Sequence, residues 1–202
     1  MKLYYSAGAC SLSPHIALRE AGLPVELVKV DIRQKKLEDG SDYRGVNPKG
    51  YVPAVELPNG EVLTEGPAIL QYVADQNPDS RLAPKAGTLE RYRLQEWLTF
   101  IGTEIHKSFS PLFDPTAPAE AKAPSLAKLN ARFDWLETQL ANKNFLLGDQ
   151  FTVADGYLFT VLNWTGHVGI DLAKWPSLLA YRTRIGSRPK VQEALKAEGL
   201  LK

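Results

Sequence analysis

The chain contains a single cysteine, Cys10, among 202 residues, and this scarcity limits its redox chemistry. A dithiol Cys-x-x-Cys cycle needs two thiols, so it is excluded within one chain. If Cys10 is oxidised, the second sulfur must come from another molecule, which points to a small thiol. One cysteine also fits a reducing compartment.

An excess of charge of one sign is also lacking. Lys and Arg number 24 against 23 Asp and Glu, and the isoelectric point is near 7.8. Nucleic acid and anionic membranes are attracted by strong positive fields, so we expect neither as a partner. The three histidines, His15, His106 and His167, are too scattered to suggest a zinc site, and we expect no metal.

Long apolar runs are absent too, because none approaches the roughly 18 residues of a membrane span. The N-terminus leads directly into a predicted strand and shows no signal-peptide pattern. We therefore expect a cytoplasmic protein. A hydrophobic content of 44% is enough for the core of one large domain or two small ones.

The chain does contain a thiol at a predicted strand-to-helix turn. The preceding Lys2-Leu3-Tyr4-Tyr5 is short and aromatic, as in a strand, and Ser11 or Ser13 could cap a following helix in which Pro14 suits the first turn. The free amides at such a helix start would favour the thiolate of Cys10 and lower its pKa. The alternative is that Cys10 is a small buried apolar residue.

Strand and helix signals alternate over residues 1–80. Predicted strands cover 25–30, 51–57 and 61–64, with an irregular helix within 31–46 and a regular helix over 68–76. Asn59-Gly60 is typical of a two-residue hairpin turn between the last two strands. The resulting order, βαβαββα, predicts a thioredoxin-like mixed sheet covered on both faces.

Strand signals do not return beyond the proline-rich stretch at 78–87. We predict a thioredoxin-like domain over 1–80, a linker over 81–87 and an all-helical domain over 88–202. Its helices should begin near the following residues: Thr88, Pro118, Thr152, Pro176 and Pro189.

Two features of this helical part are specific. Thr152 and Asp155 form a capping-box pattern. In the first long helix, Thr99, Thr103 and His106 fall on one side, because residues four and seven apart are neighbours on a helix. This polar stripe either faces a cleft or is simply solvated surface.

Motifs along the whole chain resemble those of the bacterial beta-class glutathione S-transferases. They are Gly8-Ala9-Cys10-Ser11-Leu12, Asn47-Pro48-Lys49-Gly50, Val52-Pro53-Ala54, Leu63-Thr64-Glu65-Gly66, Glu104-Ile105-His106-Lys107 and Phe151-Thr152-Val153-Ala154-Asp155. Val-Pro-Ala alone would indicate only a thioredoxin-like domain, whereas Cys10-Ser11 with His106-Lys107 is typical of the beta class. The resemblance implies the glutathione transferase fold: an α/β thioredoxin-like N-terminal domain plus an all-α C-terminal domain, assembled as a homodimer.

The resemblance also implies a site for glutathione as co-substrate. In the family the bond before Pro53 is cis and the Val52 backbone pairs with the cysteinyl part of glutathione. Glu65 would take the γ-glutamyl ammonium, and the Gly66 amide its carboxylate. Lys35 would take the carboxylate at the other end. The implied glutathione-binding set is Cys10, Lys35, Val52, Pro53, Glu65, Gly66, Thr99, Thr103, His106 and Lys107.

Cys10, Ser11 and His106 are the candidate catalytic residues. Ser11, the helix amides and His106 would stabilise a glutathione thiolate, while Cys10 would form a mixed disulfide with glutathione. Tyr5 and Trp164 are candidates for the electrophile pocket, with core packing as the alternative for each.

Thr99 departs from the family, which commonly has Asn there. That position reaches the γ-glutamyl end of glutathione from the other subunit of the dimer. Threonine is shorter and has no amide donor pair, so the resemblance implies a weakened contact across the dimer.

We therefore expect conjugation of reduced glutathione to small hydrophobic electrophiles, with Cys10-dependent thiol-disulfide exchange in addition. A glutathione-dependent reductive dehalogenase or isomerase is one alternative. A non-catalytic ligand-binding or regulatory protein of the same fold is another, although it would be expected to lose the thiol site or Glu65, and both are present.

Overall fold

The computed structural model describes residues 1–201 and contains a mixed sheet with the strand order β3-β2-β1-β4-β5. The strands are β1 (Lys2–Tyr5), β2 (Glu26–Asp31), β3 (Lys36–Leu37), β4 (Ala54–Glu56) and β5 (Val62–Thr64). β1 pairs in parallel with β2, whereas the β1–β4, β4–β5 and β2–β3 pairs are antiparallel. The predicted mixed sheet and the hairpin are therefore confirmed. The turn is longer than the predicted two residues, because the Leu57 amide donates to the Glu61 carbonyl and leaves residues 58–60 between them.

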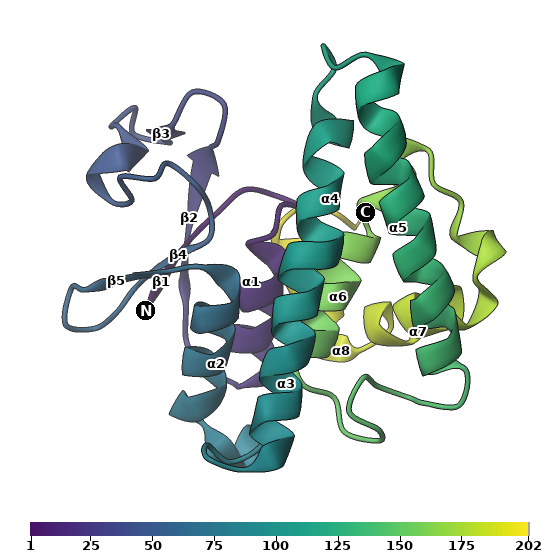
Figure 1. The fold of residues 1–202 in the computed structure, drawn as a ribbon. Coiled ribbons are helices and arrows are strands. Elements are labelled where there is room, and N and C mark those ends of the chain that lie inside the picture. Colours follow the sequence, from purple (N-terminus) through teal and green to yellow (C-terminus); the bar gives the residue numbers. More distant parts are fainter. Residues whose placement is uncertain (202) are drawn as a thin grey trace. The chain divides into compact units, whose positions relative to one another are not determined.

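Alternate residues of the central strand face opposite sides of this sheet. Tyr4 belongs to a core cluster on one face of the sheet. The cluster also contains Tyr43, from the short 3₁₀ helix Tyr43–Gly45, which covers this face. Its neighbour Leu3 is fully buried on the other side. There α1 (Leu12–Glu20) and α2 (Gly66–Gln76) pack against each other (Figure 1). The sheet is thus covered on both faces, as predicted.

The segment 31–46 contains the predicted irregular helix, as the 3₁₀ turn Tyr43–Gly45, but also a strand that the sequence does not predict. The Asp31 carboxylate accepts from the amides of Arg33 and Gln34, both at 2.9 Å, and Lys35 adopts a left-handed backbone with φ of 58°. The chain therefore reverses and adds β3 to the edge of β2. A two-residue strand is too short to show a period in the sequence.

The strand predicted over 51–57 is also shorter than expected. β4 begins only at Ala54, one residue after Pro53. Proline has no N–H to give to a sheet ladder, so it stands before the strand rather than inside it.

The chain divides into two units, and the last helix belongs to the first. One unit contains Met1–Ala83 and residues 187–201, and the other Pro84–Gly186. The sequence instead predicts a single helical domain over 88–202. The difference arises because α8 (Pro189–Ala197) packs on α1. Just before α8, the Arg188 guanidinium donates to both carboxylate oxygens of Glu20 on α1, at 2.7 and 2.9 Å.

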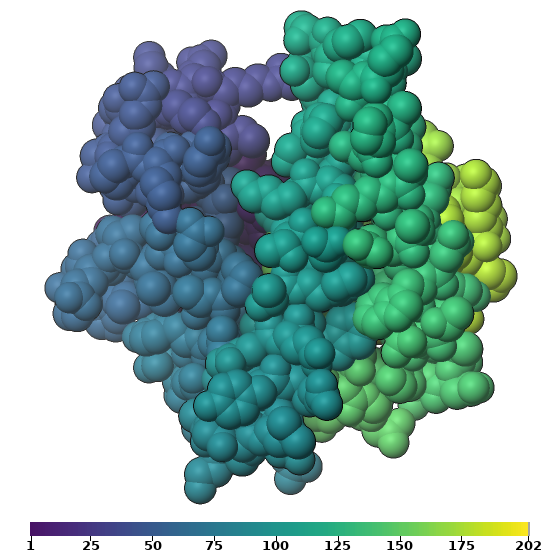
Figure 2. Space-filling model, viewed as in Figure 1, coloured from purple at the N-terminus to yellow at the C-terminus, as the bar shows by residue number. Residues whose placement is uncertain are grey.

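The second unit is helical throughout its regular structure. Its helices are α3 (Leu89–Phe100), α4 (Lys107–Phe109), α5 (Ala119–Leu140), α6 (Val153–Leu162) and α7 (Pro176–Gly186). Figure 2 shows the face built by α3, α4 and α5, coloured from teal to green. A π-helical turn, Ile101–His106, interrupts the predicted single helix between α3 and α4. Among residues 1–201, none of the helices combines the length and apolar character needed to cross a membrane.

The capping box at the start of α6 is confirmed and extended. Asp155 is completely buried and accepts from the Thr152 amide at 2.8 Å and the Thr152 hydroxyl at 2.9 Å. The same carboxylate accepts from the Leu146 amide and from the Tyr181 hydroxyl, each at 2.8 Å. One carboxylate thereby joins the start of α6 to the preceding loop and to α7.

Candidate functional site

The predicted site residues fall into two groups, one in each unit. The first unit holds Tyr5, Cys10, Ser11, Lys35, Val52, Pro53, Glu65 and Gly66. The second holds Thr99, Thr103, His106, Lys107 and Trp164.

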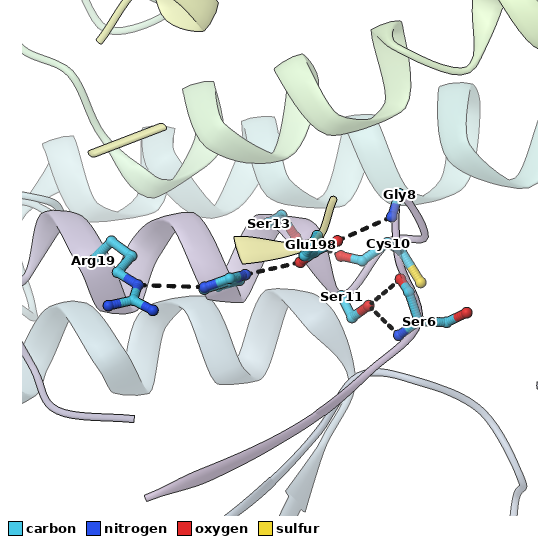
Figure 3. Close-up of polar contacts among 8 residues, drawn as sticks. Ser6, Gly8, Cys10, Ser11, Ser13, Arg19 and Glu198 are labelled. Carbon is cyan, nitrogen blue, oxygen red and sulfur yellow. Dashed lines mark hydrogen bonds and ion pairs between the residues drawn. The ribbon is translucent and has the colours of Figure 1, made fainter. Parts of the chain in front are cut away.

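Cys10 lies in the turn between β1 and α1, half-buried and free of any disulfide. Its thiol donates to the Val52 carbonyl at 3.2 Å, so the turn and the Val52-Pro53 segment meet at the sulfur. The amides of Leu12 and Ser13 donate to the carbonyls of Ala9 and Cys10, which engages them within the turn rather than at the thiol. The sulfur points away from Glu198 (Figure 3).

Ser11 is fully buried, in contrast to its neighbour. Its hydroxyl accepts from the Ser6 amide at 3.1 Å and lies 3.2 Å from the Ser6 carbonyl, to which it donates. It occupies the N-cap position of α1 but makes no side-chain capping bond. These two hydrogen bonds close the turn that carries Cys10. If the Ser11 hydroxyl bonded to a ligand, it would have to give up one of its hydrogen bonds to Ser6.

A buried carboxylate from the C-terminal segment supports the same turn. Glu198, whose side chain has no exposed surface, accepts from the Gly8 amide at 2.9 Å and lies 2.8 Å from Nδ1 of the equally buried His15 (Figure 3). Arg19 donates from Nε to the other ring nitrogen of His15 at 3.3 Å. Gly8 has φ of +70°, and Leu200 lies 3.5 Å from where its Cβ would stand. Residues near both ends of the chain thus shape the loop before Cys10.

The Val52-Pro53 peptide bond is cis, as the resemblance implies, and both residues are buried. Lys35 lies nearby, with Nζ donating to the Gly50 carbonyl at 2.9 Å and lying 5.4 Å from the Tyr51 ring centroid. Gly50 has φ of +66°, and a Cβ there would come within 3.3 Å of the Lys35 side chain. The glycine therefore allows the lysine stem to cross this turn.

Glu65 immediately precedes α2 and has a mostly exposed side chain. Its φ of 71° is left-handed, a strained conformation for a residue other than glycine. The Lys49 ammonium contacts the Glu65 carboxylate and also donates to the Thr64 hydroxyl at 2.8 Å. The resemblance assigns this carboxylate to the ammonium group of a ligand. In the structure it already binds an ammonium group of the protein, that of Lys49.

His106 ends the π-helical turn of the second unit and is partly buried. Nδ1 lies 2.7 Å from the Tyr157 hydroxyl, and the ring packs edge-on against Trp164 with centroids 4.8 Å apart. Burial, with a smaller effect of the adjacent Lys107 charge, lowers the pKa of His106 to about 4. The imidazole is therefore neutral at pH 7.

Trp164 packs within an aromatic cluster and is only 7% exposed. Its ring contacts His106, Phe109 and Phe113 edge-on, and Phe113 is 47% exposed. Tyr5, in the first unit, lies with its ring 6.4 Å from that of His15. Trp164 is thus packed among other aromatic rings, and Phe113 is the most exposed member of the cluster.

The polar stripe is only partly formed. Thr99 and Thr103 are exposed, and the Thr103 hydroxyl donates to the Thr99 carbonyl at 3.0 Å. Lys107 is exposed as well, whereas His106 turns inward to Tyr157. The wider π-helical turn changes the helical phase between the threonines and the histidine.

Three residues that contact or support these groups were not predicted from the sequence: Lys49, Tyr157 and Glu198. Lys49 lies in the quoted motif Asn47-Pro48-Lys49-Gly50, so the sequence holds a signal for this position, but the motif does not show that its lysine reaches Glu65. Tyr157 and Glu198 meet their partners 51 and 183 residues away, and no local pattern marks such contacts.

Comparisons with known proteins identify the family. The family models for the N-terminal and C-terminal domains of glutathione S-transferase match residues 7–76 and 100–189. The chain is 48% identical to glutathione S-transferase GstA of Escherichia coli O157:H7, over 99% of this chain and 100% of the relative.

Solved structures give the same result. A ternary complex of BphK, a bacterial GST, is 60% identical with a TM-score of 0.97, over 99% of this chain and 100% of that one. A beta-class glutathione S-transferase of Sphingomonas chungbukensis is 53% identical with a TM-score of 0.96, over the full length of both chains. These relatives are named transferases, which favours that function over the isomerase, dehalogenase and regulatory alternatives. The chain belongs to the glutathione S-transferase family, in its bacterial beta class.

Proposed function

We propose that this transferase conjugates reduced glutathione to small hydrophobic electrophiles. The observation that carries the proposal is the Glu65 carboxylate at the start of α2, which is exposed and already paired with an ammonium. The γ-glutamyl end of glutathione carries an ammonium beside a carboxylate. Glu65 would bind the first, and the Gly66 amide with the positive end of α2 the second.

The other anchors follow the chemistry of glutathione. The backbone at Val52 would pair with the cysteinyl residue as an added strand, next to Pro53. Lys35 would hold the carboxylate at the glycyl end. The sulfur would then lie near Cys10, and Thr99, Thr103, His106 and Lys107 would complete the binding set from the helical unit.

In the proposed reaction the glutathione thiol loses its proton to solvent, and the thiolate attacks an electrophilic carbon. With an aryl halide the carbon-sulfur bond forms and halide leaves. His106 and the positive end of the α1 dipole would stabilise the thiolate, while Ser11 would act mainly by holding the turn. Aromatic side chains such as Phe113 suit an apolar second substrate.

A second activity, thiol-disulfide exchange, is favoured by the half-exposed thiol of Cys10. Its thiolate would attack one sulfur of oxidised glutathione, forming the Cys10-glutathione disulfide and releasing the other glutathione as thiolate. A lone protein thiol with a glutathione partner needs no second cysteine.

The setting is part of the same proposal. Nearly balanced charge supports small-molecule partners rather than nucleic acid or membranes, and the single cysteine supports the cytoplasm. A homodimer is expected from the family resemblance.

Conjugation of glutathione to a panel of aryl halides tests the proposal directly. Wild type should form the thioether above the uncatalysed rate. Glu65→Ala should raise the KM for glutathione about 10-fold, because a charged hydrogen bond of ~1.5 kcal/mol is lost. Glu61→Ala, which removes an exposed carboxylate beyond the other end of β5, is the matched control and should leave KM unchanged. Absence of product with every electrophile would contradict the proposal.

A further inference from the structure

The Tyr157 hydroxyl makes a contact with His106 that the proposed function has not used. Tyr157 lies on α6, is 3% exposed, and places its hydroxyl 2.7 Å from Nδ1. The two rings meet edge-on at 5.9 Å, and Trp164 packs against the same imidazole. These contacts hold the His106 ring in one orientation.

The contact allows two positions for its hydrogen, because Nδ1 of a neutral imidazole can accept or donate. A separation of 2.7 Å is usual for a hydroxyl donor, whereas N–H donors typically lie at about 2.9–3.0 Å from oxygen. A phenol is also a better proton donor than a neutral imidazole, whose free ring nitrogen is a good acceptor. We infer that Tyr157 donates to Nδ1 and thereby holds His106 in the neutral tautomer that carries its hydrogen on Nε2.

The backbone of the π-helical turn fits around this hydroxyl. Gly102 lies in the turn, and a Cβ built there would stand 3.6 Å from the Tyr157 oxygen. The hydroxyl therefore lies against the turn as well as against the ring at its end. The extra residue of a π-helical turn rotates the residues after it, which is how His106 leaves the side of Thr99 and Thr103 and meets α6.

This inference rests on the proposed function for its chemical meaning. With its hydrogen on Nε2, His106 would donate to the glutathione sulfur and stabilise the thiolate, rather than remove the proton as a base. Burial and the nearby Lys107 lower the pKa of the ring and keep it uncharged at neutral pH, so the choice of tautomer decides its role. Tyr157 is then a positioning residue that acts through His106.

Nitrogen NMR of the ring tests the tautomer without reference to activity. The chain has three histidines, and His106→Gln identifies the signals that belong to His106. In wild-type protein with ¹⁵N-labelled histidine at pH 7, Nε2 should show the shift of a protonated nitrogen and Nδ1 that of a bare one. In Tyr157→Phe the two shifts should move toward each other as both tautomers become populated.

Kinetics with glutathione and an aryl halide give the second readout. Tyr157→Phe should lower kcat roughly 10-fold, because part of the benefit of an oriented proton donor is lost. The KM for glutathione should change less than about twofold, because binding energy from the other anchors is untouched. Tyr181→Phe is the matched control, since it removes another buried hydroxyl, the one bonded to Asp155. It should lower the melting temperature and leave the His106 tautomer and kcat unchanged.

Two results would overturn the inference: a wild-type spectrum with the hydrogen on Nδ1, or Tyr157→Phe spectra identical to those of wild type. Failure of the proposed function looks different. If His106→Gln conjugates as fast as wild type while the spectra behave as expected, the role of His106 toward glutathione is wrong and the tautomer assignment stands.

Discussion

Cys10 and Ser11 are neighbours in the sequence, yet the structure gives them different environments. The Cys10 thiol is half-buried and, as a weak sulfur donor, donates to the Val52 carbonyl. The Ser11 hydroxyl is fully buried and bonded to Ser6 on both its donor and acceptor sides. At the residue scale, these environments support the proposed roles, exchange for the Cys10 sulfur and support of the turn for Ser11.

Cys10→Ala separates conjugation from exchange. We expect the variant to keep much of its conjugation rate, because no covalent bond to Cys10 is needed for glutathione to attack an electrophile. A covalent catalyst, in contrast, would lose several orders of magnitude. His106→Ala should reduce conjugation more than Cys10→Ala does. Both are measured by thioether formation from an aryl halide.

Mass spectrometry completes this test. After incubation with oxidised glutathione, wild type should gain one glutathione that a reductant removes, and Cys10→Ala should gain none. A wild type without the adduct, together with an inactive Cys10→Ala, would contradict the division of roles.

At the scale of elements, the sequence was sufficient to predict an element wherever neighbouring residues alone determine its structure. Asn59-Gly60 predicted the hairpin, and Thr152 with Asp155 predicted the start of α6. The π-helical turn was not predictable, because Ile101 and Ile105 keep a spacing of four that also suits an α-helix. Nor was the position of α8, since its anchors pair Arg188 with Glu20 and Glu198 with His15 across most of the chain.

The C-terminal segment should be important for stability. Glu198→Ala removes the carboxylate that accepts from the Gly8 amide and the His15 ring, and each buried donor left without its acceptor costs about 1–3 kcal/mol. We expect urea unfolding to shift to a correspondingly lower midpoint. Glu193→Ala, on the same segment, breaks only an exposed pair with Lys190 and should change stability by less than ~0.5 kcal/mol. Equal effects of the two variants would contradict the importance of the buried pair.

At the scale of the whole molecule, exposed apolar side chains on the helical unit support the proposed homodimer. Leu89 and Tyr92 of α3 and Trp135 of α5 are 66%, 60% and 42% exposed. Leu89 and Tyr92 lie three positions apart on α3 and therefore share one face of that helix, and apolar groups grouped on a surface often mark an interface. Light scattering at micromolar concentration should give twice the 22.4 kDa of the chain. A mass equal to one chain would contradict the proposal.

The packing of α8 on α1 also bears on when this protein can fold during its synthesis. The first unit needs residues 187–201, yet the roughly 100 residues of the second unit are made in between, which takes about 5–20 s at usual rates of translation. During that interval the first unit is incomplete on the ribosome. Its helix α1, which includes His15, is not yet covered by α8 and Glu198. We expect a chaperone that recognises apolar segments to bind this intermediate, and the Cys10 loop to reach its final form only after the last helix has left the ribosomal tunnel.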